Sequence, residues 1–355
     1  MDFSRYNRQI ILKEFGIKGQ KKLNMSKVLV IGAGGLGIPV LQYLNSMGIG
    51  TIGVVDGDHI VESNLHRQVI YNENQLGQQK VFAASDFLKN QNRNTTIKTF
   101  NCYLNPKNAL EIIKHFDIII DASDNFATRY LVNDSCVILN KPFIYGALHG
   151  FEGQVSVFNY KNGPTYRCLF PIPPTEDEIP NCNTQGVLGV LPGIVGNFQA
   201  LECIKVITGI KKVLSGTLLI YDALSQEFHR FEVLKDSNIN EIKVLQKNYE
   251  LKCKTTFRSI SSRNITKLIT SNSIQIIDVR TPEECIDYPF NQALNIPLNA
   301  LEKRIKEINF NENVYFLCSS GIRSKKAILI LEKRHKTAKL IDISGGLKAI
   351  SNNAS

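Results

Sequence analysis

The sequence lacks the marks of a membrane or secreted protein. No run of apolar residues reaches the roughly 18–20 positions that a membrane-spanning helix needs. The N-terminus, from Met1 to Arg5, has no apolar core and no small-residue cleavage site. These absences predict a cytoplasmic protein without membrane contact.

Two further absences narrow the function. The eight cysteines include no C-x-x-C pair, and a disulfide framework is not expected in a cytosolic chain of this length. The net charge of +10 is moderately basic, but no basic stripe interleaved with aromatic residues accompanies it. Nucleic-acid binding is therefore not expected.

Two successive α/β patterns are present. The 355 residues suffice for two domains. Alternating strands and helices predict a mainly parallel sheet with right-handed crossovers in the first domain. We place this domain at residues 1–234, a linker rich in Lys, Asn and Asp at 235–256, and a smaller α/β domain at 257–355. The proline-rich stretch 164–185 is predicted to be a long loop that is either functional or disordered.

In the first domain, the expected strands cover residues 28–31, 51–55, 97–104, 117–120, 142–148, 154–158, 217–221 and 227–234. The expected helices there cover 36–47, 78–89 and 187–208. In the second domain, strands are expected at 274–278, 314–317 and 339–343, with a helix at 324–334.

A glycine-rich loop stands between the first strand and the first helix. Gly32, Gly34, Gly35 and Gly37 occur in a stretch that reads G-x-G-x-x-G. Glycines let phosphates approach the backbone, and a helix N-terminus supplies amides and a favourable dipole. Asp56 ends the next strand, where a carboxylate can bind ribose hydroxyls. The pattern predicts a Rossmann-like nucleotide-binding domain. An NAD or FAD enzyme and a loop that merely packs tightly are the alternatives at this point.

Polar residues near the loop favour ATP over a nicotinamide. They are Asp58, Asn64, Arg67, Gln68 and Lys80, followed by Asp124 and Asn125 after a later strand. Cations at a phosphate loop neutralise a triphosphate and a departing pyrophosphate. Asp124 lies where the carboxyl ends of the strands meet, and a carboxylate beside phosphates suits Mg²⁺. A hydride-transfer enzyme needs none of these groups.

Together these motifs resemble the MoeB/ThiF/HesA family, bacterial relatives of ubiquitin-activating enzymes. The resemblance covers about residues 4–234. It rests on the segments 5–10 (RYNRQI), 32–37 (GAGGLG), 56–68, 77–80 (GQQK) and 124–125 (DN).

The resemblance implies an activity and a partner. The expected reaction is ATP-dependent adenylylation of the C-terminal carboxylate of a ubiquitin-like sulfur-carrier protein that ends in Gly-Gly. The family implies a homodimer in which Arg8 reaches into the ATP site of the other subunit. Asn64, Arg67 and Lys80 resemble the contacts to the phosphates and leaving group, and Asp124 resembles the Mg²⁺-binding acid.

Cys182 lies between the proline-rich loop and a predicted helix start. A thiol near a helix N-terminus can be activated. By resemblance, Cys182 corresponds to the cysteine that forms a transient covalent link during sulfur transfer. The alternative is a cysteine that only packs in a loop.

Many relatives bind zinc through two C-x-x-C pairs. Here the first pair would lie at 165–168 and retains only Cys168, and the second, near 236–241, has no cysteine. A Cys₄ site cannot be built, so we predict no zinc.

A second cysteine loop occurs in the smaller domain. Cys318 follows a strand, precedes a helix and is separated from Arg323 by four residues. Backbone amides and a helix N-terminus in such a loop stabilise a thiolate or persulfide. The same geometry suits phosphate, but tyrosine-phosphatase loops are longer by one residue.

This domain resembles the rhodanese family. The matching segments are 278–284 (DVRTPEE), 293–298 (ALNIPL) and 345–347 (GGL). The usual histidine before the second segment is absent, and Tyr288, Pro289 and Phe290 stand there. An inactive rhodanese is the alternative, although Cys318 and Arg323 are both retained.

The two resemblances together predict adenylylation followed by sulfur transfer. A Cys318 persulfide, loaded by a donor such as a cysteine desulfurase, would attack the acyl-adenylate, and Cys182 could release a thiocarboxylate for molybdopterin or thiamine synthesis. A nicotinamide-dependent oxidoreductase and a non-catalytic carrier-protein scaffold are the competing hypotheses.

Overall fold

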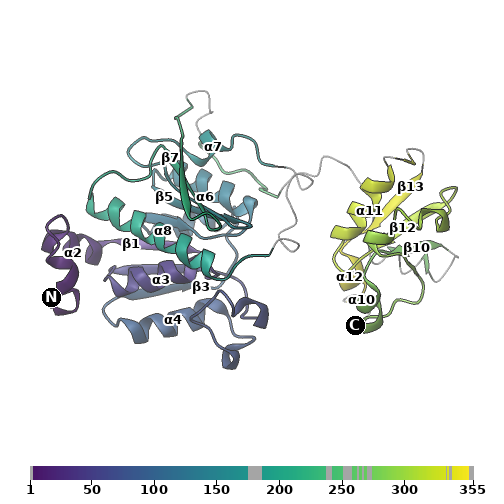
Figure 1. The fold of residues 1–355 in the computed structure, drawn as a ribbon, viewed down its shortest axis with the longest axis horizontal. Helices are drawn as coiled ribbons and strands as arrows, with labels where there is room; N and C mark the ends of the chain where they lie inside the picture. Colours follow the sequence, from purple (N-terminus) through teal and green to yellow (C-terminus); the bar gives the residue numbers. More distant parts are fainter. Residues whose placement is uncertain are drawn as a thin grey trace. The chain divides into compact units, whose positions relative to one another are not determined.

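The chain folds into two compact units (Figure 1). The computed structural model describes residues 3–174, 186–236, 242–250, 258–261, 264–265, 268–269, 274–332, 334–335 and 338–351. The first unit runs from Met1 to Cys253 and the second from Lys254 to Ser355.

The first unit is built on an eight-stranded sheet in the order β3-β2-β1-β4-β5-β6-β7-β8. The strands are β1 (Lys27–Ile31), β2 (Thr51–Val55), β3 (Thr96–Phe100), β4 (Ile118–Asp121), β5 (Phe143–His149), β6 (Glu152–Phe158), β7 (Thr217–Asp222) and β8 (Glu227–Glu232). The strands from β3 to β5 pair in parallel, and β6, β7 and β8 continue the sheet antiparallel. The predicted α/β fold is confirmed. The strand order reverses between β1 and β4, where such sheets bind ligands.

Helices cover both faces of this sheet. One face carries α3 (Gly37–Ser46), α4 (Lys80–Gln91) and α8 (Val190–Thr208), and the other carries α5 (Ala109–Ile113), α6 (Phe126–Ile138) and α7 (Tyr166–Leu169). Along β1, Val28 and Val30 pack into the first core while Leu29 and Ile31 pack into the second. Burial on both faces explains why the central strands are continuously apolar.

The three helices predicted for the first domain are present as α3, α4 and α8, with small shifts at their ends. Several other helices were not predicted, among them α2 (Gly16–Met25), α5 and α6. Helix α8 also corrects a sequence expectation. By length and composition it is the one helix in the described part of the chain that could cross a membrane, and half of its apolar stretch is buried inside the protein. Its buried side chains, including Leu191, Val195 and Cys203, belong to the core under the sheet.

Residues 242–250 pack on the first unit, although they fall within the predicted linker 235–256. The Tyr249 hydroxyl donates to Asp134 Oδ2 at 2.7 Å, and Tyr249 is only 9% exposed. Arg167 donates to both oxygens of the same carboxylate at 2.7 and 2.8 Å. The described part of this segment is therefore held by a buried ionic network.

The second unit has a five-stranded parallel sheet in the order β11-β10-β12-β13-β9. Its strands are β9 (Arg258–Ile260), β10 (Gln275–Asp278), β11 (Leu294–Asn295), β12 (Asn313–Leu317) and β13 (Lys339–Ile343). Its helices include α10 (Pro282–Asp287), α11 (Ile322–Glu332) and α12 (Gly346–Ser351). The smaller α/β domain predicted from the sequence is thus confirmed.

Candidate functional sites

A cavity of about 690 Å³ opens at the carboxyl ends of the parallel strands in the first unit. It brings together nearly all of the nucleotide-site residues predicted from the sequence. Those that line it are Gly32, Gly34, Gly35, Asp56, Asp58, Asn64, Arg67, Gln68, Lys80, Asp124 and Asn125. Residues that are up to about 90 positions apart in the sequence therefore face one space.

The glycine loop is shaped by contacts that exclude larger residues. Gly32 has a φ of +101°, and a Cβ added there would lie 2.7 Å from the Ala122 carbonyl oxygen. Gly37 does not line the cavity. A Cβ on Gly37 would lie 1.8 Å from the Gly32 carbonyl oxygen, so this glycine is required for packing of the loop against α3.

Two acids after β2 organise one wall. Asp56 accepts the Ala33 amide and the Asp58 amide, both at 2.8 Å. Burial raises the pKa of Asp56, and these amides and Lys80 oppose the rise. Asp56 therefore holds the glycine loop in addition to facing the cavity where ribose was expected.

Lys80 is the buried cation of the site. It is 5% exposed, and its ammonium lies 3.0 Å from Asp58 Oδ2. Tyr103, which the sequence did not single out, donates to Asp58 Oδ1 at 2.6 Å. Burial alone would raise the pKa of Asp58, but Tyr103 and Lys80 together hold it below its usual value. The ammonium is thus fixed in position by an ionised partner.

Arg67 and Gln68 approach the glycine loop from the side. The Arg67 guanidinium donates to the Ser63 carbonyl oxygen at 2.9 Å, and its side chain lies close to Gly35. Gln68 is 3% exposed, and its Oε1 has no hydrogen-bond partner in the structure. A buried polar atom without a partner normally needs one, so Gln68 is suited to receive a donor group of a ligand in this cavity.

The start of α6 forms the opposite wall. Asn125 caps this helix by accepting the Thr128 amide at 2.9 Å, and its side-chain amide lies 3.4 Å from Asp124 Oδ1. Arg129, one turn later, also lines the cavity and is 8% exposed. Arg129 was not predicted from the sequence because α6 itself was not predicted. The signal was available, since Asn125 is a good cap and Arg129 follows at helical spacing.

The predicted site residue Arg8 lies away from this cavity. Arg8 is exposed on α1 (Asn7–Ile10) and does not line the cavity of its own chain. Cys182 lies outside the described residues. Across the part of the chain that the structure describes, no group of three or more His, Cys, Asp or Glu side chains could hold a metal ion. Cys168 instead accepts the Thr165 amide at 3.3 Å.

In the second unit, Cys318 follows β12 and is 1% exposed. The thiol lies deeper than the sequence suggested, since it was expected at the mouth of the loop. The Gly321 amide donates to its Sγ at 3.1 Å, and Gly321 has a φ of +88°. The Leu347 amide, at the start of α12, donates to the Cys318 carbonyl oxygen at 2.8 Å.

Arg323 does not stand free beside the thiol. Its two terminal nitrogens donate to the carboxylate of Glu284, at 2.5 and 2.6 Å, and Ser319 also donates to Glu284. Arg323 holds the pKa of Glu284 down, at about 2, against the effect of burial. The positive charge predicted for this loop is present, but it is largely compensated by an acid that was not singled out from the sequence.

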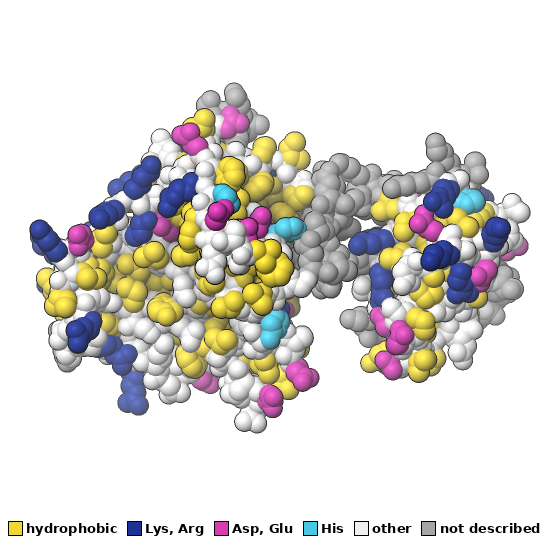
Figure 2. All heavy atoms as spheres, in the orientation of Figure 1, with side chains coloured by type: hydrophobic (Ala, Val, Ile, Leu, Met, Phe, Trp, Pro, Cys, Tyr) yellow, Lys and Arg dark blue, Asp and Glu magenta, His cyan; other side chains and the backbone are white. Residues whose placement is uncertain are grey.

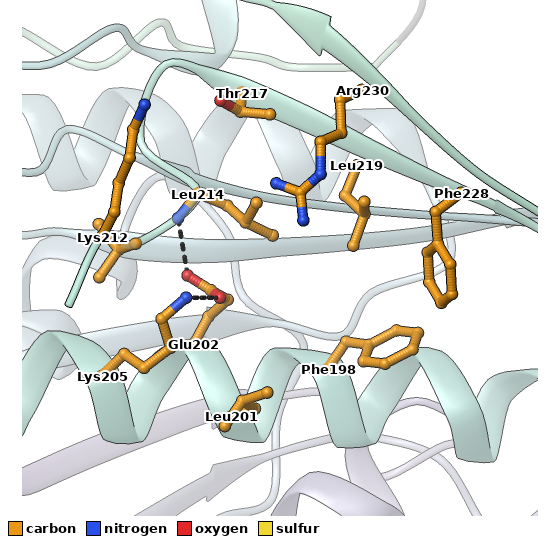
Figure 3. Close-up of a pocket in the computed structure, with 11 residues that line it drawn as sticks. Phe198, Leu201, Glu202, Lys205, Lys212, Leu214, Thr217, Leu219, Phe228 and Arg230 are labelled. Atoms are coloured by element: carbon orange, nitrogen blue, oxygen red, sulfur yellow. Dashed lines mark hydrogen bonds and ion pairs between the residues drawn. The ribbon is translucent and has the colours of Figure 1, made fainter. Parts of the chain in front are cut away.

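A smaller cavity of about 390 Å³ lies between α8 and the β7–β8 hairpin (Figure 3). Phe198, Leu201 and Phe228 supply apolar walls, and the side chain of Arg230 points into the cavity. Its one carboxylate, Glu202, is fully engaged, with Lys205 at 2.6 Å and the Leu214 amide at 2.7 Å. This groove therefore offers no free carboxylate for a reaction.

Comparisons with known proteins agree with the two resemblances. Residues 6–241 match the ThiF family, and residues 262–353 match the rhodanese-like domain. The chain is 38% identical, over 99% of its length and 87% of the relative's, to "Adenylyltransferase and sulfurtransferase MOCS3" of Xenopus laevis. It is 39% identical, over 99% of its length and 93% of the relative's, to "Probable molybdopterin-synthase adenylyltransferase" of Porphyra purpurea.

Solved structures support the fold of the first unit. Escherichia coli MccB in complex with MccA-N7isoASN superposes with a TM-score of 0.62 at 21% identity, covering 68% of this chain and 75% of MccB. A structure of MccB with ATP gives a TM-score of 0.60 at 23% identity, over 68% and 74% of the two chains. The full-length matches decide the family and the type of activity. The chain belongs to the ThiF family, carries a C-terminal rhodanese-like domain, and is an enzyme with adenylyltransferase and sulfurtransferase activities.

Proposed function

We propose that the first unit uses ATP to adenylylate the C-terminal glycine carboxylate of a ubiquitin-like sulfur-carrier protein, and that the second unit supplies sulfur as a persulfide of Cys318. The product is a carrier thiocarboxylate for molybdopterin synthesis. The observation that carries the proposal is the 690 Å³ cavity, in which a phosphate-binding loop, Lys80, Arg67 and Asp124 face one space. Full-length relatives named for both activities support the pairing with a sulfur-transfer domain.

The adenylylation step needs position and charge rather than a general base. The attacking group is a carboxylate, which is already ionised at neutral pH. The enzyme must hold it in line with the α-phosphorus and neutralise charge on the leaving pyrophosphate. Lys80 is fixed by Asp58 and buried, so its charge acts in a poorly screened environment. Arg67 and the loop amides supply the remaining donors.

Asp124 fits a role in binding Mg²⁺. The ion is usually held by one or two carboxylates together with substrate phosphates and water, so a three-residue protein cluster is not required. Asp124 is an exposed carboxylate on the wall of the cavity. A bound ion would supply additional neutralisation of phosphate charge, with Asp124 as its protein ligand.

We further propose a homodimer in which Arg8 completes the partner's ATP site. Arg8 is exposed and lies outside the cavity of its own chain. Hydrophobic side chains gather on the face that carries α3, α4 and α8 (Figure 2), and Tyr43, Phe82 and Leu201 of these helices are all more than half exposed. A continuous apolar face on a water-exposed surface indicates an interface.

Sulfur transfer would proceed in two steps. The terminal sulfur of the Cys318 persulfide attacks the acyl carbon, the bond to the phosphate oxygen breaks, and AMP leaves with the electron pair. A second thiolate, which we assign to Cys182, then attacks Sγ of Cys318, and the carrier leaves as a thiocarboxylate. This step forms a Cys182–Cys318 disulfide, which a cellular dithiol must reduce before the next turnover. A cysteine desulfurase is the proposed source of the persulfide.

Replacing Cys318 by Ala separates the two activities. We expect the variant to retain ATP–pyrophosphate exchange in the presence of carrier and to lose thiocarboxylate formation, measured by mass spectrometry of the carrier. Cys285→Ala, in the same unit, is the matched control and should retain both. A panel of molybdopterin-pathway and thiamine-pathway carriers identifies the substrate. Thiocarboxylate formation by Cys318→Ala would disprove the role of the second unit, and absence of exchange with every carrier would disprove that of the first.

A further inference from the structure

A buried polar pair lies directly behind the Cys318 thiol. Ser324, on α11, places its Oγ 3.6 Å from Cys318 Sγ and donates to Asp342 Oδ1, on β13, at 2.5 Å. The three residues are 1%, 0% and 1% exposed. Sulfur, hydroxyl and carboxylate therefore form a continuous chain of hydrogen-bonding groups inside the unit.

The direction of the hydrogen bonds limits what Ser324 can do. A serine hydroxyl has one proton and two lone pairs. While Asp342 is ionised, it accepts the hydrogen bond of the Ser324 hydroxyl. A lone pair of Ser324 Oγ is then left to accept a hydrogen bond from the thiol of Cys318. Movement of the Ser324 proton onto Asp342 reverses the arrangement, because the hydroxyl then donates to a thiolate.

We propose that Asp342 is the proton acceptor for Cys318, acting through Ser324. The thiol proton moves to Ser324 Oγ as the hydroxyl proton moves to Asp342 Oδ1. The resulting thiolate attacks the outer sulfur of a donor persulfide, the donor S–S bond breaks, and the donor leaves as a thiolate with the electron pair. Protons and charge balance, since one negative charge passes from carboxylate to sulfur. The inference rests on the sulfur-transfer role proposed for this unit.

The surroundings favour this transfer. Burial raises the pKa of Asp342, and Ser324 and Lys325 only partly oppose the rise, so the neutral acid is accessible. On the sulfur side, Gly321 donates an amide. The charge of Arg323 acts on Cys318, but Glu284 holds Arg323 in an ion pair and Asp278 also interacts with it. Because Glu284 neutralises Arg323, this cation stabilises a Cys318 thiolate less than a free arginine would. A proton acceptor inside the unit can take over part of that role.

The pH dependence of Cys318 reactivity tests the relay. The full-length protein is treated with iodoacetamide, and alkylation of the peptide that carries Cys318 is followed by mass spectrometry. In the unsubstituted protein the proton moves internally, so the rate should change by less than about threefold between about pH 6 and pH 8. In Asp342→Asn and Ser324→Ala the proton must pass to solvent, and the rate should rise by close to tenfold per pH unit.

Controls keep the test independent of folding and of the proposed function. Ser324→Thr retains a hydroxyl and should keep the flat profile, and Asp287→Asn changes an exposed carboxylate of α10 and should do the same. Unfolding midpoints establish that each variant is folded, and if Asp342→Asn is not, Ser324→Ala against Ser324→Thr decides. A steep profile in the unsubstituted protein, or equal slopes for Ser324→Ala and Ser324→Thr, would overturn the relay. The readout needs neither ATP nor carrier, so it remains valid if thiocarboxylate formation proves independent of Cys318.

Discussion

At the residue scale, we expect the first site to depend most on Lys80. Its ammonium is buried and held by Asp58. Lys80→Met removes the charge and keeps much of the volume, and it leaves Asp58 without its cation. We expect ATP–pyrophosphate exchange to fall by on the order of 10²–10³, the usual cost of removing one preorganised charge partner. Lys89→Met, an exposed lysine on the same helix, is the control, and a loss within threefold of that control would show that Lys80 has no part in the reaction.

The carboxylate of Glu284 makes the stability of the second unit depend on pH. Its folded-state pKa is about 2 because Arg323 and Ser319 bind the carboxylate, whereas the unfolded value is close to 4.5. A depressed pKa means that the stabilisation is complete above the unfolded pKa and is lost as the pH falls toward the folded one. Glu284→Gln should therefore be less stable than the unsubstituted protein at neutral pH, and the difference should shrink between about pH 5 and pH 3.

Urea unfolding of the second unit at several pH values measures this difference. Asp287→Asn alters another exposed carboxylate of α10 and serves as the control. The carboxylate of Glu284 is partly exposed, so solvent screens the ion pair and a modest effect is expected. A stability difference that is constant with pH would mean that the Glu284–Arg323 pair contributes nothing through its charge.

At the scale of elements, the sequence predicted those helices and strands whose formation depends on neighbouring residues. The unit β1–α3–β2 was predictable because an apolar strand, a glycine loop and a periodic helix follow each other directly. Helix α6 was not, because polar side chains such as Arg129, Asn133 and Asp134 are buried in it. The partners of Asp134, Arg167 and Tyr249, are 33 and 115 residues away from it. No local periodicity can reveal a polar residue that is buried only because distant partners satisfy it.

The same reason explains which residues of the two sites were predicted from the sequence and which were not. Gly32 and Asp56 were found because each directly follows the end of a strand, and Lys80 was found because the segment 77–80 resembles the family. Arg129 and Glu284 were missed because each acquires its place through tertiary packing. Glu284 meets Arg323 across 39 residues of sequence.

The network around Asp134 makes an element-scale prediction. Tyr249→Phe retains the buried ring and removes only the hydroxyl that donates to Asp134. Loss of a hydrogen bond to a buried charged group should destabilise the first unit by about 1.5–3 kcal/mol, measured by denaturant unfolding. Tyr160→Phe, whose ring lies at the edge of the core in the same unit, should cost less than about 0.5 kcal/mol. Equal effects of the two changes would mean that residues 242–250 do not depend on this bond.

At the scale of the whole molecule, the ATP site of one chain is proposed to be incomplete without Arg8 of another. Arg8→Ala and Lys80→Met should each be inactive as pure proteins, because every site lacks one of the two cations. In a mixed dimer, the site on the Arg8→Ala subunit keeps its own Lys80 and receives Arg8 from the Lys80→Met subunit. Random mixing makes half of the dimers mixed, with one intact site in each, so co-expression should restore about a quarter of the exchange activity. If Arg8 acted within its own chain, every mixed dimer would contain two defective sites, and co-expression would restore no more activity than either variant has alone.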